Sequence, residues 1–311
     1  MKKNIKLLLP AYFVLLCACN SGSASNQSTN ATSSDTITTF ILPSIPPMYT
    51  TPEQRADFLI KHYWDHINFA DTNYIHHPEV TEQGWANYCD ILNHVPLTTA
   101  QEAIRGVMDK ANVERKVFDH LADLADKYLY DPNSPMRNEE FYIPVLEAMI
   151  ASPLLNETDK IRPIARLKLA EKNRIGTKAL DFTYTLASGA QNSLYHIKSR
   201  YTLLFISNPG CQACGETIAK LKSMPVINQL IANKSLTILS IYPDEELDEW
   251  KKHYNDFPTE WINAYDKKLA IKEQQLYDLK AIPTLYLLDT DKKVLLKDTP
   301  EQAVEEYLLI H

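Results

Sequence analysis

The sequence predicts an all-helical domain followed by an α/β domain, whose mixed central sheet is flanked by helices. From Thr51 to Asn173, apolar residues recur at three- and four-residue spacings, with no strand-like alternation and only two glycines. From Arg174 onward, short apolar runs alternate with helical segments and turn residues, which is the order of an α/β domain. The 311 residues suffice for two ordinary domains and a tail.

Composition and charge exclude several classes of function. A hydrophobic content of 45% and a charged content of 23% are typical of globular proteins. Removal of residues 1–18 would take away three of the 32 basic residues and none of the 39 acidic ones, so the formal charge would change from −7 to −10. No long basic run remains, and we therefore expect neither a nucleic-acid partner nor electrostatic docking to a membrane.

The N-terminus predicts an exported and lipidated protein. Three lysines precede Leu7 to Leu16, an almost wholly apolar run that is too short to span a bilayer. The sequence Leu16-Cys17-Ala18-Cys19 resembles a bacterial lipobox, which implies a signal peptide of residues 1–18 and a lipid on Cys19. A signal peptide without lipidation is the alternative. We expect a protein of the cell envelope, anchored by its lipid to a bacterial membrane and facing the periplasm.

The rest of the chain divides into a tether and two domains. Residues 19–50 are predicted to form a flexible tether, because Ser, Asn, Thr and Ala dominate its first part. The helical domain covers 51–173 and begins at Thr51-Pro52-Glu53, a cap followed by a first-turn proline. Further helices are predicted over 98–107, 114–128, 139–149 and 158–173.

The helical domain contains a cysteine that could be reactive and two histidines that could bind a metal. Cys89 shares one helical face with Trp85 and Tyr88, which predicts a buried and inert thiol. His62 and His66 are four residues apart, but no glutamate lies between them in the HExxH order of a metalloprotease. We therefore expect these histidines to hold no metal.

Cys211-Gln-Ala-Cys214 is the motif that predicts a reaction. It follows the apolar run of residues 201–207 and a turn, and it opens a segment with the composition of an amphipathic helix. The positive end of a helix dipole favours a thiolate at Cys211, and Cys214 lies one turn away, where it can resolve a mixed disulfide. Zinc sites use the same spacing but need two further ligands. No second pair follows, and His253 and His311 are isolated, so we expect no metal and no cofactor beyond a redox-active disulfide.

A second motif, Ile282-Pro283-Thr284, opens an apolar strand. Together with the CxxC pair it resembles the thioredoxin superfamily, in which a β-branched residue, a cis proline and a threonine face the cysteines. The resemblance implies a cis bond before Pro283 and a role for Ile282, Pro283 and Thr284 in binding an extended substrate peptide.

Residues 174–184 resemble the entry of TlpA/ResA-type envelope thioredoxins, and this resemblance covers 174–311. A helical domain of unknown function precedes such a domain in lipoproteins of Gram-negative anaerobes, whose order this chain shares. The α/β domain is predicted to begin with a hairpin whose second strand lies at 193–197. Further strands and helices are predicted after this hairpin. These are strands at 203–207, 236–242, 284–289 and 293–297, and helices after Cys211, at 226–233, 245–254, near 271–277 and from 299 onward.

The chain departs from the family in three ways. Gln212-Ala213 separates the cysteines, Asn208-Pro209-Gly210 rather than a Trp precedes Cys211, and Phe205 stands where cytosolic thioredoxin keeps a buried acid. Glu216 is the acid nearest in sequence, but a solvated first-turn acid is the simpler interpretation. The proton acceptor for Cys214 is therefore not identified by the sequence.

The leading hypothesis is a membrane-tethered thiol–disulfide oxidoreductase. Its partners would be proteins with thiols or disulfides and an electron donor in the membrane or envelope, with either direction of electron flow open. A thiol peroxidase would need Thr or Ser three residues before the reactive cysteine, where this chain has Asn208. The other alternative is a non-catalytic binding lipoprotein, in which the helical domain captures a partner and the thioredoxin fold is a scaffold.

Overall fold

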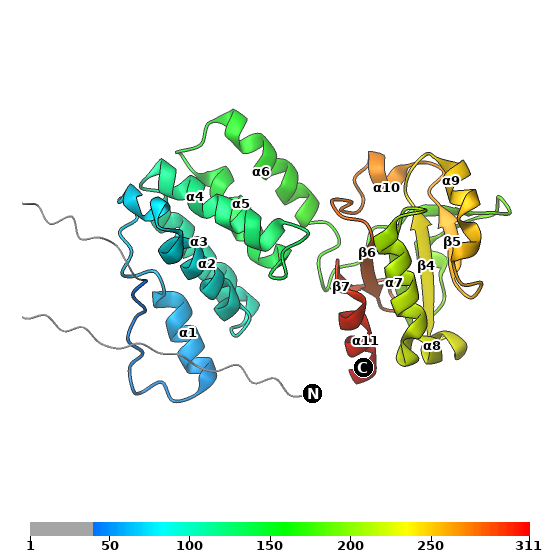
Figure 1. Cartoon of the computed structure of the whole chain (residues 1–311), viewed down its shortest axis with the longest axis horizontal. Coiled ribbons are helices and arrows are strands. Elements are labelled where there is room, and N and C mark those ends of the chain that lie inside the picture. The colour runs from blue at the N-terminus through cyan, green and yellow to red at the C-terminus, as the bar shows by residue number, and fades with distance from the viewer. Residues whose placement is uncertain (1–39) are drawn as a thin grey trace, which may run out of the picture. The chain divides into compact units, whose positions relative to one another are not determined.

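The computed structural model describes residues 40–311, so the predicted signal peptide, Cys19 and most of the predicted tether lie outside the described residues. The described chain begins with helices and continues with a seven-stranded sheet that carries helices on its faces (Figure 1). The predicted fold class, an all-helical part followed by an α/β part, is confirmed. No helix within residues 40–311 combines the length and the apolar character of a membrane span.

The helical part is built from elements with clear local start signals. Thr51 and Asn156 each form a capping box at the start of a helix, and Asn138 caps a third one through its side chain. The elements are α1 (Pro52–His62), η1 (Thr72–His76), α2 (Pro78–Leu92), α3 (Leu97–Ala111), α4 (Arg115–Ala125), the π-helical turn η2 (Asp126–Tyr130), α5 (Glu139–Ala151) and α6 (Glu157–Ala170).

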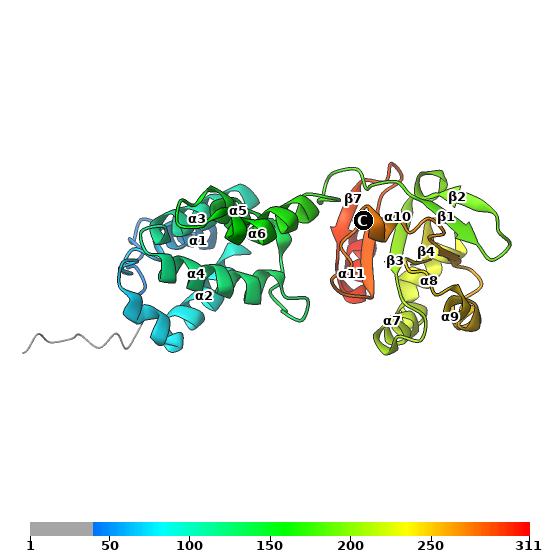
Figure 2. The same cartoon turned by 90° about the horizontal axis from the view of Figure 1, so that it is seen from above.

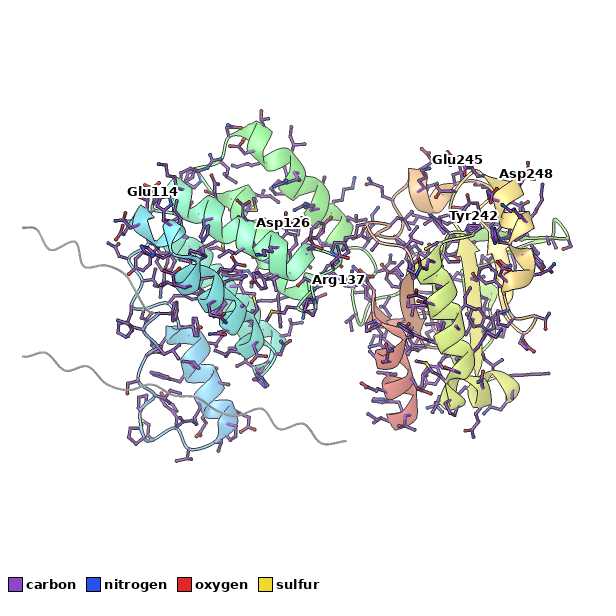
Figure 3. The ribbon with its side chains drawn as sticks, in the orientation of Figure 1. Glu114, Asp126, Arg137, Tyr242, Glu245 and Asp248 are labelled. Atoms are coloured by element: carbon purple, nitrogen blue, oxygen red, sulfur yellow. The ribbon has the colours of Figure 1, made fainter. Side chains whose placement is uncertain are left out.

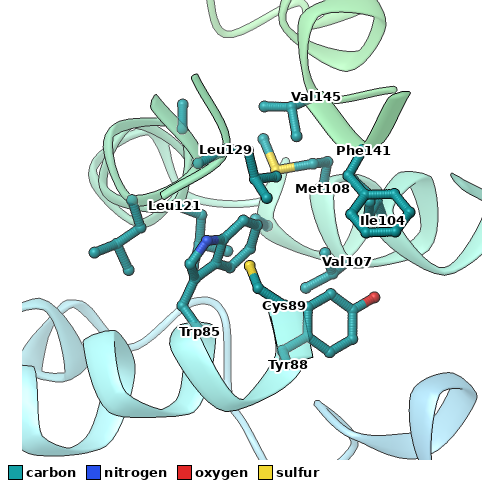
Figure 4. Close-up of a cluster of buried hydrophobic side chains, with 14 of the residues drawn as sticks. Trp85, Tyr88, Cys89, Ile104, Val107, Met108, Leu121, Leu129, Phe141 and Val145 are labelled. Atoms are coloured by element: carbon teal, nitrogen blue, oxygen red, sulfur yellow. The ribbon is translucent and has the colours of Figure 1, made fainter. Parts of the chain in front are cut away.

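The core of the helical part is apolar and rich in aromatic rings (Figure 4). Trp85, Tyr88 and Met108 are fully buried, and the side chain of Cys89 lies among them with 1% of its surface exposed. Burial raises the pKa of the Cys89 thiol to about 12. The prediction that this thiol is buried is confirmed.

The sheet has the strand order β2-β1-β5-β4-β3-β6-β7, in which β3, β4 and β5 run parallel and the other pairings are antiparallel. Along β3, Leu203 and Phe205 face one apolar cluster while Leu204 and Ile206 face another, as strand alternation requires. The strands are β1 (Thr183–Leu186), β2 (Gln191–Ser193), β3 (Tyr201–Ile206), β4 (Leu236–Tyr242), β5 (Ile262–Tyr265), β6 (Thr284–Leu288) and β7 (Val294–Lys297).

Helices close both faces of this sheet. The first face packs against α7 (Gln212–Ser223), α8 (Pro225–Ala232) and α11 (Glu301–Ile310), and both views show α8 beside β4 (Figure 1; Figure 2). The second face is covered by side chains such as Phe182, Leu194 and Tyr277. The remaining elements are η3 (Leu194–His196), α9 (Leu247–Lys252), η4 (Tyr254–Asp256) and α10 (Ala270–Glu273).

One strand of the sheet was missed, and two predicted elements have different bounds in the structure. The strand β5 was not predicted, because the buried Asn263 interrupts its apolar pattern and is satisfied by the indole N–H of Trp250 at 3.1 Å. The second hairpin strand ends at Ser193, since Leu194 turns into the core within a 3-10 turn. The helix expected near 271–277 ends at Glu273, ahead of Gln275, whose φ is +48°.

Candidate functional site

Cys211 occupies the N-terminal cap of α7, directly after the loop that leaves β3. Its backbone is extended, with φ −70° and ψ 122°, and its Sγ accepts a hydrogen bond from the N–H of Cys214 at 3.4 Å. The backbone N–H of Cys214 and the start of α7 thus both lie against this sulfur. The side chain is partly exposed, so a substrate can reach it.

Cys214 lies one turn further along α7 and is a different kind of thiol. Only 2% of its surface is exposed, and it packs in the same apolar cluster as Ile218 and Leu221. Burial, reinforced by the contact with Cys211, raises the pKa of the Cys214 thiol to about 12. Both cysteines are free thiols in the structure. The pair therefore combines an accessible sulfur at a helix start, Cys211, with a buried and protonated thiol, Cys214.

The turn before Cys211 is held in a conformation that favours glycine. Gly210 has a φ of +69°, and a Cβ added there would lie 3.2 Å from Nε2 of His253. Nδ1 of His253 is 2.7 Å from a carboxylate oxygen of Asp256. His253 was not expected near the motif from the sequence, yet its imidazole is packed against the loop that carries Cys211.

The acids around the loop lie at the end of β4. A hollow of about 300 Å³ is bounded by Asn208 and Pro209 on one side and by acidic residues on the other. Figure 3 shows Tyr242, Glu245 and Asp248 gathered at this end of the domain. Lys272 offsets part of this charge, since its Nζ lies 3.0 Å from Glu245.

The position of the buried acid of cytosolic thioredoxin is apolar in this chain. Phe205 is fully buried and meets the indole of Trp261 edge to face at 6.1 Å between centroids. Glu216 lies at the surface, where its carboxylate accepts a hydrogen bond from Gln212 at 2.9 Å. Neither residue places a carboxylate against Cys214, in agreement with the departure from the family noted in the sequence.

The second predicted motif lies beside the first. The Ile282–Pro283 bond is cis, and Thr284 opens β6 directly opposite Ile206, the last residue of β3. The CxxC loop leaves from that same end of β3, so Pro283 and the thiols share one edge of the sheet. Ile282 and Cys211 both pack against the apolar cluster that contains Cys214.

A set of charged residues behind this motif was missed by sequence reasoning. The hydroxyl of Thr284 donates to the carboxylate of Asp298 at 2.8 Å, and Arg137 forms an ion pair with the same carboxylate at 3.1 Å. Arg137 comes from the helical part, so no local pattern could have linked it to Thr284. Within residues 40–311, no group of three or more His, Cys, Asp or Glu side chains is arranged to hold a metal ion.

Two protein families match this architecture. Residues 18–173 match the family described as a domain of unknown function (DUF5106), and residues 199–294 match the thioredoxin-like family. The chain belongs to the first of these families and carries a thioredoxin-like domain in its C-terminal half.

Three similar proteins match different parts of this chain. The crystal structure of a thioredoxin-like protein from Bacteroides caccae is 72% identical, with a TM-score of 0.87 over 89% of this chain and 100% of that one. A C-terminal domain from Bacteroides fragilis is 66% identical over 44% of this chain and 98% of its own, with a TM-score of 0.44. The thiol-disulfide oxidoreductase ResA of Bacillus cereus is 28% identical over 139 residues, which are 44% of this chain and 76% of that protein. The C-terminal half is homologous to these ResA-like proteins.

Proposed function

We propose that this chain is a thiol–disulfide oxidoreductase that acts on protein substrates in the cell envelope. The observation that carries the proposal is the asymmetry of its CxxC pair. Sγ of Cys211 accepts a hydrogen bond from the N–H of Cys214 at a helix start. Cys214 is buried, and its raised pKa keeps its thiol protonated at neutral pH. This is the division of labour that dithiol exchange requires. The name of the Bacillus relative supports the same activity.

In the reducing direction, the Cys211 thiolate attacks one sulfur of a substrate disulfide. The substrate S–S bond breaks, a mixed disulfide forms, and the departing substrate sulfur takes up a proton. Cys214 then attacks Sγ of Cys211, which releases the second substrate sulfur and leaves a Cys211–Cys214 disulfide. Two electrons pass from the enzyme to the substrate, and two protons end on its two thiols. The oxidising direction reverses these steps.

The high pKa of Cys214 orders the two steps. A thiol that keeps its proton at neutral pH is a poor nucleophile, so Cys214 does not compete with Cys211 for the substrate. Cys214 acts only once the mixed disulfide lies next to it. No cofactor other than the redox-active disulfide is needed for these steps.

The proposal is tested by brief alkylation and by a redox titration. We expect a short pulse of iodoacetamide at neutral pH to label Cys211 first, with Cys214 and Cys89 protected by burial. A titration against glutathione buffers should give one two-electron couple that disappears in Cys211→Ser and persists in Cys89→Ser. Absence of a reversible couple would leave the binding-scaffold hypothesis in its place.

We also propose that the protein is held at a bacterial membrane by a lipid on Cys19 and faces the periplasm. The support is the lipobox-like Leu16-Cys17-Ala18-Cys19 ahead of a Ser- and Asn-rich segment. Cys19→Ser should abolish palmitate labelling and move the protein out of the membrane fraction, or block its processing. Unchanged labelling in that variant would contradict the proposal, and a variant at Cys17 serves as its matched control.

A further inference from the structure

A cleft of about 580 Å³ opens beside Pro283, and its two walls come from the two halves of the chain. The thioredoxin-like wall includes Ile282, Pro283 and Leu285. The opposite wall is the loop from Pro132 to Asn138, which joins η2 to α5 of the helical part, together with Ile175 on the connecting segment. The cleft is lined by the Pro283 motif and by Thr217 of α7, the helix that carries the cysteines, so this motif is bordered by a surface that the thioredoxin-like domain alone does not provide.

The wall from the helical part is a fixed structure. Within its loop, the backbone N–H of Ser134 donates to the carbonyl of Asp131 at 3.0 Å, and the N–H of Met136 donates to the Ser134 hydroxyl at 3.2 Å. The N–H of Asn138 closes the loop by donating to the carbonyl of Leu129 at 3.0 Å. Because the polar backbone of the loop is satisfied internally, the loop presents Pro132 and Pro135 as exposed apolar contacts.

Ion pairs fasten this wall to two residues near the Pro283 motif, Lys280 before it and Asp298 directly after β7. Arg137 binds both the backbone carbonyl and the side-chain carboxylate of Asp298. The same carboxylate accepts a hydrogen bond from the hydroxyl of Thr284. Glu139, at the start of α5, lies 3.1 Å from Nζ of Lys280. These side chains expose at most 19% of their surface, so the pairs are poorly screened by solvent. The wall is therefore held at a fixed distance from the Pro283 motif.

The other side of the cleft has unused hydrogen-bonding groups. No hydrogen bond within residues 40–311 uses the backbone N–H or C=O of Ala281 or Ile282. These residues precede β6 and border the cleft. An extended peptide can pair with such free backbone groups as an added strand, while its side chains enter the space in front of them.

We propose that the loop 132–138 and Ile175 form a binding wall for the substrate polypeptide. An extended segment of the substrate lies along Ile282, and an apolar side chain next to its reacting cysteine packs against Pro135 and Ile175. The proposal rests on the proposed function for the identity of the ligand, and it assigns to the helical half a part in choosing the substrate.

The test separates substrate binding from thiol chemistry by comparing a large and a small disulfide. The large one is the symmetric disulfide of an eleven-residue peptide whose central cysteine is flanked by leucine and valine. The small one is 5,5′-dithiobis(2-nitrobenzoate), which has no peptide backbone and no aliphatic side chain next to its sulfur. A fluorescein-labelled peptide with serine in place of cysteine reports binding without reaction, by anisotropy with the full chain.

The variants are Pro135→Glu and Ile175→Glu, both at exposed positions on the wall. Each places a charge where the apolar side chain would lie, and we expect KM for the peptide disulfide and Kd for the serine peptide to rise about tenfold. The rate with the small disulfide should stay within about twofold. Ile161→Glu changes an isoleucine that is 65% exposed on α6 and does not border the cleft, and this control should alter nothing.

The outcomes distinguish this inference from the proposed function. If Pro135→Glu leaves both KM and Kd within about twofold of the wild type, the helical wall does not bind substrate, even where disulfide exchange is intact. If the wild type exchanges neither disulfide but binds the serine peptide, and Pro135→Glu weakens that binding, the cleft is upheld and the proposed function is overturned. If the serine peptide does not bind the wild type at all, the cleft proposal is wrong.

Discussion

The two halves of the chain each bury a cysteine, but they bury it in different settings. Cys89 lies inside α2 and within an aromatic core, where the ring centroids of Tyr63 and Tyr88 are 5.3 Å apart. Cys214 lies at the margin of an apolar cluster, one turn below an exposed thiol. The pKa of both thiols is raised to about 12 by burial. Burial alone therefore does not decide reactivity, because of these two buried thiols only Cys214 has another cysteine beside it among the described residues.

The junction between the halves differs from both cores. Its side chains are charged and largely buried, and they include Glu139, Lys280 and Lys297. Burial alone would lower the pKa of Lys280, but the charges of Glu139 and Asp278 raise it above its ordinary value. Buried ion pairs tolerate only one geometry, so this junction ties one half to the other at a specific position.

The largest expected effect tests whether the aromatic core supports only its own half. Trp85 is fully buried, and Trp85→Ala should lower the free energy of unfolding by about 3–5 kcal/mol. Because the junction couples the halves, we expect one shifted urea transition, followed by tryptophan fluorescence and far-UV circular dichroism. Leu204→Ala in the other half is the matched variant and should cost about 2–5 kcal/mol in the same single transition. Two separate transitions in either variant would mean that the halves unfold independently.

The next effect tests the junction directly. Nζ of Lys297 donates hydrogen bonds to the carbonyls of Ala170 and Lys172 at the end of α6. It also lies 2.6 Å from a carboxylate oxygen of Glu139, with which it forms an ion pair but no hydrogen bond. Lys297→Met should therefore lower the free energy of unfolding by about 3 kcal/mol.

A double-mutant cycle in urea separates the charge from the packing at this position. In Lys297→Met the carboxylate of Glu139 keeps Lys280 but loses its second lysine, and adding Glu139→Gln removes that excess negative charge and should recover part of the loss. Lys268→Met, outside the junction, is a control for the loss of one positive charge. The cycle also needs Glu139→Gln alone, and a loss in the double variant equal to the sum of the two single losses would show that the ion pair carries no coupling energy.

The parts of the site that the sequence predicted are those that depend on contiguous residues. A strand, a turn and a helix start place Cys211 and Cys214 without reference to the rest of the chain. The motif at Pro283 was predictable because it opens a strand, and the pairing of Thr284 with Ile206 then brings it to the thiols.

The parts that the sequence did not predict depend on side-chain pairing across the fold. Arg137 reaches Asp298 only because the helical half docks at the end of β7, and nothing in either local sequence signals that contact. His253 reaches Gly210 only because α9 follows β4 on the side of the CxxC loop. Such contacts are set by tertiary packing, which hydrophobic periodicity does not encode.

A third prediction compares the two buried thiols through pH. A thiol whose pKa is raised on folding stays protonated while the unfolded chain ionises, so the free energy of unfolding of the reduced protein falls as pH rises from about 9 to 12. Each thiol contributes up to about 1.4 kcal/mol per pH unit in that window. Cys89→Ala and Cys214→Ala should each remove one such contribution, measured as the difference from wild type in urea midpoints. If the free energy of unfolding falls with pH as steeply in Cys214→Ala as in the wild type, Cys214 is not a buried thiol with a raised pKa.

The smallest effect tests the contact between the CxxC loop and His253. Gly210 and Gly189 both have positive φ, +69° and +84°, so an alanine at either position carries the left-handed penalty of about 1–2 kcal/mol. They differ in surroundings, because an added Cβ meets Nε2 of His253 at 3.2 Å at Gly210 and has nothing within 4 Å at Gly189. We therefore expect Gly210→Ala to lower the free energy of unfolding by up to about 1 kcal/mol more than Gly189→Ala, and to slow exchange at Cys211 where Gly189→Ala does not. His253→Ala combined with Gly210→Ala should remove the excess, measured by urea titration and by the alkylation rate of Cys211. If the two glycine variants behave alike in both measurements, the imidazole does not constrain the loop.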